Sequence, residues 1–179
     1  MTVLNAVPRL DSVLDLHRTP LAGDFTGYRN HCYRVLNFCV ALTGDDETTR
    51  DKIAIAVAFH DLGIWTAGTF DYLPPSRQLA CAYLTTHGLD AWISEIETMI
   101  EQHHKIAPYR GEHARLTEAF RKADLADVSL GLLAGGLPGA FVADVRRAFA
   151  NAGFHRFLAV QFGRRLRTHP FNPAPMVHF

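Results

Sequence analysis

Residues 53–59 read Ile-Ala-Ile-Ala-Val-Ala-Phe, and this stretch decides the fold class of the chain. Large apolar side chains alternate with alanines, and this period of two suits a strand as well as a helix that is buried on most sides. The three alanines favour a helix, and Asp45 or Asp46 can cap its start. Because the chain offers no other strand, we predict a buried helix that runs towards Asp61 and stops at Gly63.

On both sides of this stretch the pattern stays helical. Before it, apolar side chains recur at helical spacing after Pro8 and over residues 26–42. After it, the same spacing predicts helices over residues 75–87, 90–104, 112–130, 139–151 and 153–167. We therefore predict an all-α fold, a compact bundle of six to eight helices that forms one domain over residues 1–179.

Two segments lack helical spacing. Residues 64–75 form a predicted loop of twelve residues with three aromatic side chains, Trp65, Phe70 and Tyr72. A loop of this length is uncommon unless it is functional, so these side chains either cover a ligand or close the bottom of the core. Residues 170–179 contain three prolines, which predict an extended tail without regular structure.

Composition excludes several classes of protein. Eighteen basic and eighteen acidic residues cancel, so we expect no nucleic-acid polymer on a broad positive face. The longest apolar run, residues 53–59, is far shorter than the roughly 20 residues that span a bilayer, and no secretory signal is visible. The three cysteines show no C-x-x-C spacing. These features predict a reduced, soluble, cytoplasmic protein that does not bind a membrane.

Several of the ten histidines occupy positions that point into the protein. On the helix predicted over 90–104, at 100° per residue, His103 falls about 20° from Ile96, in the middle of the apolar face. His104 falls at the edge of that face, and His31 falls inside the apolar stripe of the 26–42 helix. A single inward histidine is commonly a hydrogen-bonded core residue, so each of these positions alone allows that interpretation.

Two aspartates share this inward orientation. Asp124 lies about 40° and Asp127 about 20° from Phe120 on the predicted 112–130 helix. A buried carboxylate is costly unless it is paired or coordinated. Asp124 is too far from the helix ends for capping, whereas a hydrogen bond near the helix end remains an alternative for Asp127.

The dipeptide His60-Asp61 ends the buried 53–59 helix. Three other predicted helices each direct a histidine or an aspartate inward. One metal ion would satisfy all of these groups together, and coordination is a usual way of holding buried charge.

The order His31, His60-Asp61 and Asp124 along the chain resembles the motif of the HD superfamily of metal-dependent phosphohydrolases. The resemblance covers about residues 26–131 and depends on four segments: Asn30-His31-Cys32-Tyr33-Arg34-Val35, Ala58-Phe59-His60-Asp61-Leu62-Gly63, Met99-Ile100-Glu101-Gln102-His103-His104 and Ala123-Asp124-Leu125-Ala126-Asp127. It implies an all-α, HD-domain-like fold in which one divalent metal ion is held by His31, His60, Asp61 and Asp124.

The chain departs from several branches of that superfamily. Members with two metals often carry a further histidine early in the helix after the His-Asp pair, where this chain has Ser76 and Arg77. The cyclic-dinucleotide branch commonly has a lysine two residues after the glycine, where this chain has Trp65. No branch that would define the substrate is matched.

The resemblance implies an enzyme that cleaves a phosphate ester of a small molecule or nucleotide with metal-activated water. Asp61 is the ligand best placed to accept a proton, and His103 and His104 are further catalytic candidates. For substrate binding we expect Lys105 and Arg110, for which ordinary surface charge is the alternative, together with Tyr72. Residue types alone allow Mn, Fe, Co, Ni or Zn.

Two alternatives stay open. Some members of the superfamily are di-iron oxygenases, and here His103 and His104, with His87, could supply a second metal site. A domain of this kind can also bind a ligand without catalysis. The partners expected are a small phosphorylated substrate and, if the protein is a homo-oligomer, further copies of the chain.

Overall fold

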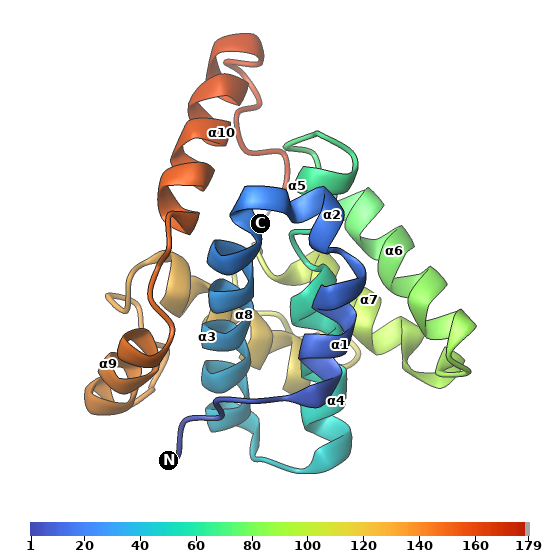
Figure 1. Cartoon of the computed structure of the whole chain (residues 1–179), viewed down its shortest axis with the longest axis vertical. Coiled ribbons are helices and arrows are strands. Elements are labelled where there is room, and N and C mark those ends of the chain that lie inside the picture. Colours follow the sequence, from blue (N-terminus) through green and yellow to red (C-terminus); the bar gives the residue numbers. More distant parts are fainter. Residues whose placement is uncertain (178–179) are drawn as a thin grey trace.

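The chain is all-helical over residues 1–177, the part that this computed structural model describes (Figure 1). No strand occurs in that part. Eight helices have nine residues or more: α1 (Pro8–Leu16), α3 (Phe25–Thr43), α4 (Glu47–Phe59), α6 (Leu73–Thr86), α7 (Ile93–Gln102), α8 (Ala114–Val128), α9 (Gly139–Ala148) and α10 (Phe154–Thr168). Four shorter elements join them: α2 (Arg18–Leu21), α5 (Gly63–Thr66) and the 3-10 turns η1 (Ala22–Asp24) and η2 (Asp90–Trp92). The predicted all-α bundle is confirmed.

The ambiguous stretch is a helix. It forms the second half of α4, and its side chains are at most 1% exposed from Ile53 to Phe59. The Asp46 side chain caps this helix by accepting a hydrogen bond of 2.9 Å from the Thr49 amide. Burial on all sides explains the misleading period of two, because alanines and larger side chains alike face neighbouring helices.

Four helices form a closed ring at the centre of the molecule. Helix α3 packs on α4 and α8, and α7 also packs on α4 and α8 (Figure 1). Helix α1 covers α4 from outside, α6 covers α7, and α9 lies against α3. Each of the four helices of the ring carries, along or just after it, one or more of the inward histidines or aspartates.

The prediction of a loop over residues 64–75 is wrong at both ends. Its first residues belong to α5, and α6 begins at Leu73, so that only a short segment between them lacks helix. Pro74 and Pro75 occupy the first turn of α6, where a missing N–H costs nothing because the first helical amides have no partner in the helix. The two prolines therefore belong to the start of this helix, although the predicted loop extends to residue 75.

The tail after α10 has neither helix nor strand in its described part, residues 169–177, as its prolines predict. It is not extended, however. Turns bring it back towards α5 (Figure 1), where Met176 is buried against Ile64, Tyr72 and Leu73. Burial of an apolar side chain explains the return. The predicted tail also includes residues 178–179, which lie outside the described residues.

The remaining sequence expectations concern thiols and membranes. All three cysteines are free: Cys32 and Cys39 are buried and Cys81 is half-buried. Among residues 1–177, no helix combines the length and the apolar character that crossing a membrane requires.

Candidate metal centre

The four ligands implied by the sequence resemblance meet inside the helical ring. His31 lies on α3, His60 and Asp61 directly follow α4, and Asp124 lies on α8; all four side chains are buried. The Nε2 atoms of His31 and His60 are 3.0 Å apart. From these two nitrogens, one oxygen of Asp61 lies at 3.7 and 3.3 Å, and one oxygen of Asp124 lies at 3.6 and 3.7 Å.

These separations fit a coordinated cation. Bonds of about 2.1 Å place two ligand atoms about 3.0 Å apart at a right angle and about 3.4 Å apart in a tetrahedron. The measured distances between nitrogen and its neighbouring donors run from 3.0 to 3.7 Å. His31, His60 and Asp61 form a group whose ligand atoms all lie within 4.8 Å of one another, and one oxygen of Asp124 lies 3.6 and 3.7 Å from the two nitrogens. Such mixed nitrogen and oxygen donors could hold a divalent metal ion.

Hydrogen bonds fix both imidazoles with their lone pairs facing this point. The Nδ1 atom of His60 donates to the Val57 carbonyl oxygen at 2.8 Å, and Nδ1 of His31 donates to Asp127 at 2.7 Å. In its neutral form, each ring with its Nδ1 hydrogen bonded in this way presents a bare Nε2 atom. Two bare nitrogens at 3.0 Å repel each other unless a proton or a cation lies between them. The arrangement thus calls for positive charge at the centre of the site.

Asp127 supports His31 from behind. Its carboxylate accepts from His31 and also from Arg34, whose Nη2 atom donates at 2.8 Å. Burial raises the pKa of Asp127, but these two partners hold it well below its usual range, so the group stays ionised. The carboxylate–histidine arrangement is the usual outer support of a metal ligand. Asp127 is thus hydrogen-bonded near the end of α8, as the sequence alternative allows, and its partners are the side chains of His31 and Arg34 on α3.

Arg34 is the functional residue that sequence reasoning missed. It is 1% exposed, and its remaining N–H groups donate to the carbonyl oxygens of Phe149 and Ala150 at 3.0 and 3.3 Å. Its position three residues after His31 places both on one face of α3, and this spacing was the available signal.

A second donor group adjoins the first. His103 follows α7, and its Nδ1 atom donates to the Ile100 carbonyl oxygen at 2.6 Å. Its Nε2 atom lies 3.5 Å from the second oxygen of Asp61. Among the described residues, both atoms are buried without a hydrogen-bond partner. Ligand atoms of Asp61, His103 and His104 lie within 4.8 Å of one another, so Asp61 belongs to two potential metal-binding groups.

The charges of the site reinforce one another. Burial lowers the pKa of His60, but the carboxylates of Asp61 and Asp124 outweigh burial and raise it to about 9. Burial raises the pKa of both aspartates, but the neighbouring histidines lower it further, to below the usual range. Burial and the neighbouring His103 lower the pKa of His104 to about 3, so this ring is neutral. Without a metal, a proton on His60 therefore supplies the positive charge.

The chain was compared with protein-family models, curated proteins and solved structures. It matches none of them. The resemblance to the HD superfamily therefore stays a prediction from the sequence motifs, and the chemistry of the site must be argued from its own atoms.

Tyr72 joins the site from the segment before α6. It is buried, and its hydroxyl lies 2.7 Å from Nε2 of His104. Burial raises the pKa of Tyr72 well above its usual value, so the hydroxyl keeps its proton and donates to the neutral imidazole. Tyr72 is thus buried in the core and contacts a site residue, and the covering of a ligand by the aromatic segment stays a prediction.

The start of α6 fits tightly behind the His-Asp pair. Ser76 is buried, and its hydroxyl accepts the Gly63 amide at 2.9 Å. A side chain at Gly63 would approach the Tyr72 carbonyl oxygen to 2.5 Å. Where two-metal members of the HD superfamily carry a histidine, this chain therefore has a side chain that hydrogen-bonds the backbone. His87 lies at the other end of α6, bonded to the Tyr83 carbonyl oxygen at 2.7 Å, and joins neither donor group.

The two cationic side chains predicted to bind the substrate, Lys105 and Arg110, lie in different places. A pocket of about 350 Å³ opens beside the centre, and Lys105 lines it together with His103, His104 and Asp124. Arg110 lies on the exposed loop before α8 and does not line that pocket. Tyr109, on the same loop, lines a different depression on the far side of α7.

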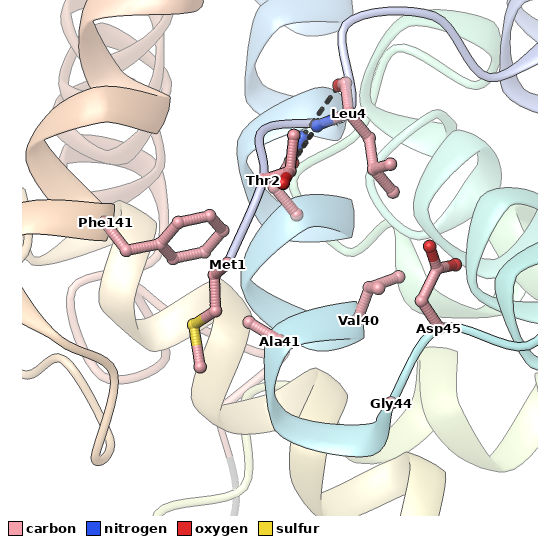
Figure 2. A pocket seen from close by; sticks show the side chains of 9 residues that line it. Met1, Thr2, Leu4, Val40, Ala41, Gly44, Asp45 and Phe141 are labelled. Carbon is pink, nitrogen blue, oxygen red and sulfur yellow. Dashed lines mark hydrogen bonds between the residues drawn. The ribbon is translucent and has the colours of Figure 1, made fainter.

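Another cavity, of about 330 Å³, lies at the C-terminal end of α3 between the first residues of the chain and Phe141 of α9 (Figure 2). The Asn37 side chain and the Leu4 backbone hydrogen-bond each other there, at 2.8 and 3.1 Å. Asn37 lies six residues beyond His31, about 9 Å along the helix, and no histidine lines the cavity. This cavity therefore takes no part in the metal centre.

Proposed function

We propose that this protein is a metal-dependent phosphohydrolase that cleaves a phosphate ester of a small molecule, in the manner of the HD superfamily that its motifs resemble. One observation carries the proposal: inside a ring of four helices, the Nε2 atoms of His31 and His60 lie 3.0 Å apart, and each lies 3.3 to 3.7 Å from one oxygen of Asp61 and one oxygen of Asp124. Buried carboxylates are costly unless they are paired or coordinate a metal ion, and a shared cation would satisfy these donors together.

His31, His60, Asp61 and Asp124 would hold the ion, which would be Mn, Fe, Co, Ni or Zn because the donors are mixed nitrogen and oxygen. When bound, a divalent ion polarises a phosphoryl oxygen and lowers the pKa of water towards neutrality. His31 and Asp124 lie on α3 and α8, and His60 and Asp61 directly follow α4, so the four donors are positioned by three helices of the ring.

Protons in this site are handled by Asp61 and His103. One oxygen of Asp61 and Nε2 of His103 are buried and lack hydrogen-bond partners among the described residues. The Nδ1 hydrogen of His103 is committed to Ile100, so its neutral ring offers Nε2 as a proton acceptor. His104, held by Tyr72, lines the pocket and positions the substrate.

A second candidate is favoured by the shared position of Asp61. Its two oxygens face different histidines, His60 and His103, as a carboxylate between two ions would. A two-iron centre with oxygenase activity would use the same residues, with His104 as a further donor. Metal counting separates the candidates, because two irons per chain together with O₂ consumption favour the oxygenase.

The test is metal analysis followed by hydrolysis assays. The purified protein is analysed for metal, stripped, reloaded with each of the five metals, and assayed for phosphate release from a panel of small phosphate esters. Asp61→Asn should abolish hydrolysis, whereas Asp71→Asn, which changes an exposed aspartate in the same region, should not. Failure of every reloaded form to release phosphate, or full activity of Asp61→Asn, contradicts the proposal.

A further inference from the structure

The pocket beside the metal centre is lined by polar and apolar side chains. Its polar lining consists of His103, His104 and Asp124, which adjoin the candidate centre, together with Lys105 and Arg121. The rest of its wall comes from segments far apart in the sequence, among them the loop after α7, helix α8, the segment after it and the returning tail. The pocket is therefore a product of the tertiary fold, and it leads directly to the site.

The apolar lining of the pocket consists of side chains that the fold leaves in contact with solvent. Ile106 is 56% exposed, Leu125 37%, Val128 38%, Leu133 56% and Val177 42%, and all five line this one pocket. Single exposed apolar side chains are common on protein surfaces, but a group gathered around one cavity marks a binding groove. Their position beside the metal centre indicates that the groove receives the substrate.

The polar groups along this wall already have partners. Arg121 donates two hydrogen bonds to the Glu118 carboxylate, at 2.8 and 2.7 Å, and a third to the Lys105 carbonyl oxygen at 3.2 Å. The Leu133 amide donates to the Ser129 hydroxyl at 3.0 Å. Among the described residues, no serine, threonine, asparagine or glutamine side chain lines the pocket. Beyond His103, His104, Asp124, Lys105 and Arg121, the wall therefore has no polar side chain for the hydroxyls of a sugar or the edge of a base.

We propose that the substrate is a phosphate monoester of a small apolar alcohol, with its phosphoryl group at the histidine end and its hydrocarbon body against Leu125, Val128 and Leu133. This inference rests on the proposed function for the placement of the phosphoryl group. The cavity of about 350 Å³ holds about twelve non-hydrogen atoms at roughly 30 Å³ each. A phosphate group takes five of these, which leaves room for a body of about five to eight carbons.

Binding and turnover are measured separately, so that the two proposals can fail separately. Calorimetry on the metal-loaded protein follows the dissociation constants of methyl-, butyl- and hexylphosphonate, which cannot be hydrolysed. We expect affinity to rise about twofold to fourfold for each methylene, and therefore at least about 30-fold from methyl to hexyl. We also expect butylphosphonate to bind more tightly than 3,4-dihydroxybutylphosphonate, which has the same length but carries two hydroxyls.

Variants locate the effect in the pocket. Leu125→Gln should weaken hexylphosphonate binding about tenfold and leave methylphosphonate binding unchanged. Leu132→Gln is the matched control, because Leu132 is 86% exposed and does not line the pocket. Leu133→Gln, on an exposed segment outside the helices, serves as a second test should Leu125→Gln lose stability.

Affinity that is independent of chain length, or preference for the dihydroxy compound, overturns the inference even if phosphate esters are hydrolysed. Chain-length dependence that Leu125→Gln and Leu133→Gln leave unchanged overturns the assigned pocket. If these variants abolish the dependence on chain length, the inference is supported. If the same metal-loaded protein then does not hydrolyse butyl phosphate, only the proposed phosphohydrolase activity is contradicted.

Discussion

Replacement of Asp127 by asparagine separates the support of the metal centre from the packing of the fold. In the structure this carboxylate accepts from His31 at 2.7 Å and from Arg34 at 2.8 Å, and all three side chains are at most 2% exposed. Loss of an outer partner of a metal-binding histidine lowers metal affinity about 10- to 100-fold. This corresponds to about 1.4 to 2.8 kcal/mol of binding free energy.

The same change lowers the stability of the metal-free protein, because Arg34 loses its counter-ion. Breaking a buried pair costs about 3 to 5 kcal/mol. Arg34 keeps its bonds to the Phe149 and Ala150 carbonyl oxygens, so we expect the lower end, about 3 kcal/mol. Urea denaturation of the metal-free protein measures the loss, and competition with a coloured chelator measures metal affinity.

Two controls make the result decisive. In the double variant Arg34→Met/Asp127→Asn the stranded charge is gone, so stability should largely recover while metal affinity stays low. Glu118→Gln removes another carboxylate from an arginine pair on α8, the one with Arg121, and should lower stability without weakening metal binding. Wild-type metal affinity in Asp127→Asn would refute the supporting role of Asp127.

Three further predictions concern the residues around the centre. Tyr72→Phe removes the donor to His104 and should raise KM with a change in unfolding free energy of only about 1 kcal/mol, measured by kinetics and urea denaturation. His103→Ala should reduce kcat or the binding of a second metal, whereas His104→Ala should chiefly weaken substrate affinity; equal, negligible effects would assign both rings a purely structural role. His60 holds a proton below about pH 9 in the metal-free site, and this proton must leave before Nε2 binds a metal. Metal affinity measured by calorimetry should therefore rise about tenfold per pH unit between pH 7 and 9, and a flat profile would contradict this competition.

Local patterns predicted the fold and most inward side chains. The period of two in residues 53–59 did not distinguish a helix from a strand. The cap at Asp46 and the alanines of these residues correctly favoured the helix. Helical angles placed His31, His103 and Asp124 inside their apolar faces, and all three are buried. These features depend on neighbours within two turns of one helix, and such neighbours can be read from a single sequence.

Partners across helices could not be read in this way. The angle of Asp127 indicated that it points inward, but its partner Arg34 lies 93 residues earlier in the sequence. Tyr72 and His104 are 32 residues apart and meet only because α6 packs on α7. The return of the tail depends on the burial of Met176 against residues from the start of α5 and α6. Periodicity describes one element at a time, so it carries no information on such pairs.

The number of metal ions bound per chain in matched histidine variants tests directly whether His60 belongs to a metal centre. His60 and His87 both follow a helix and both bond a backbone carbonyl oxygen of the preceding turn through Nδ1, but only His60 faces the centre. After stripping and reloading, elemental analysis should find at least one divalent ion per chain in the wild type and in His87→Ala, and none tightly bound in His60→Ala. A full metal complement in His60→Ala, or none in the wild type, would contradict the metal centre.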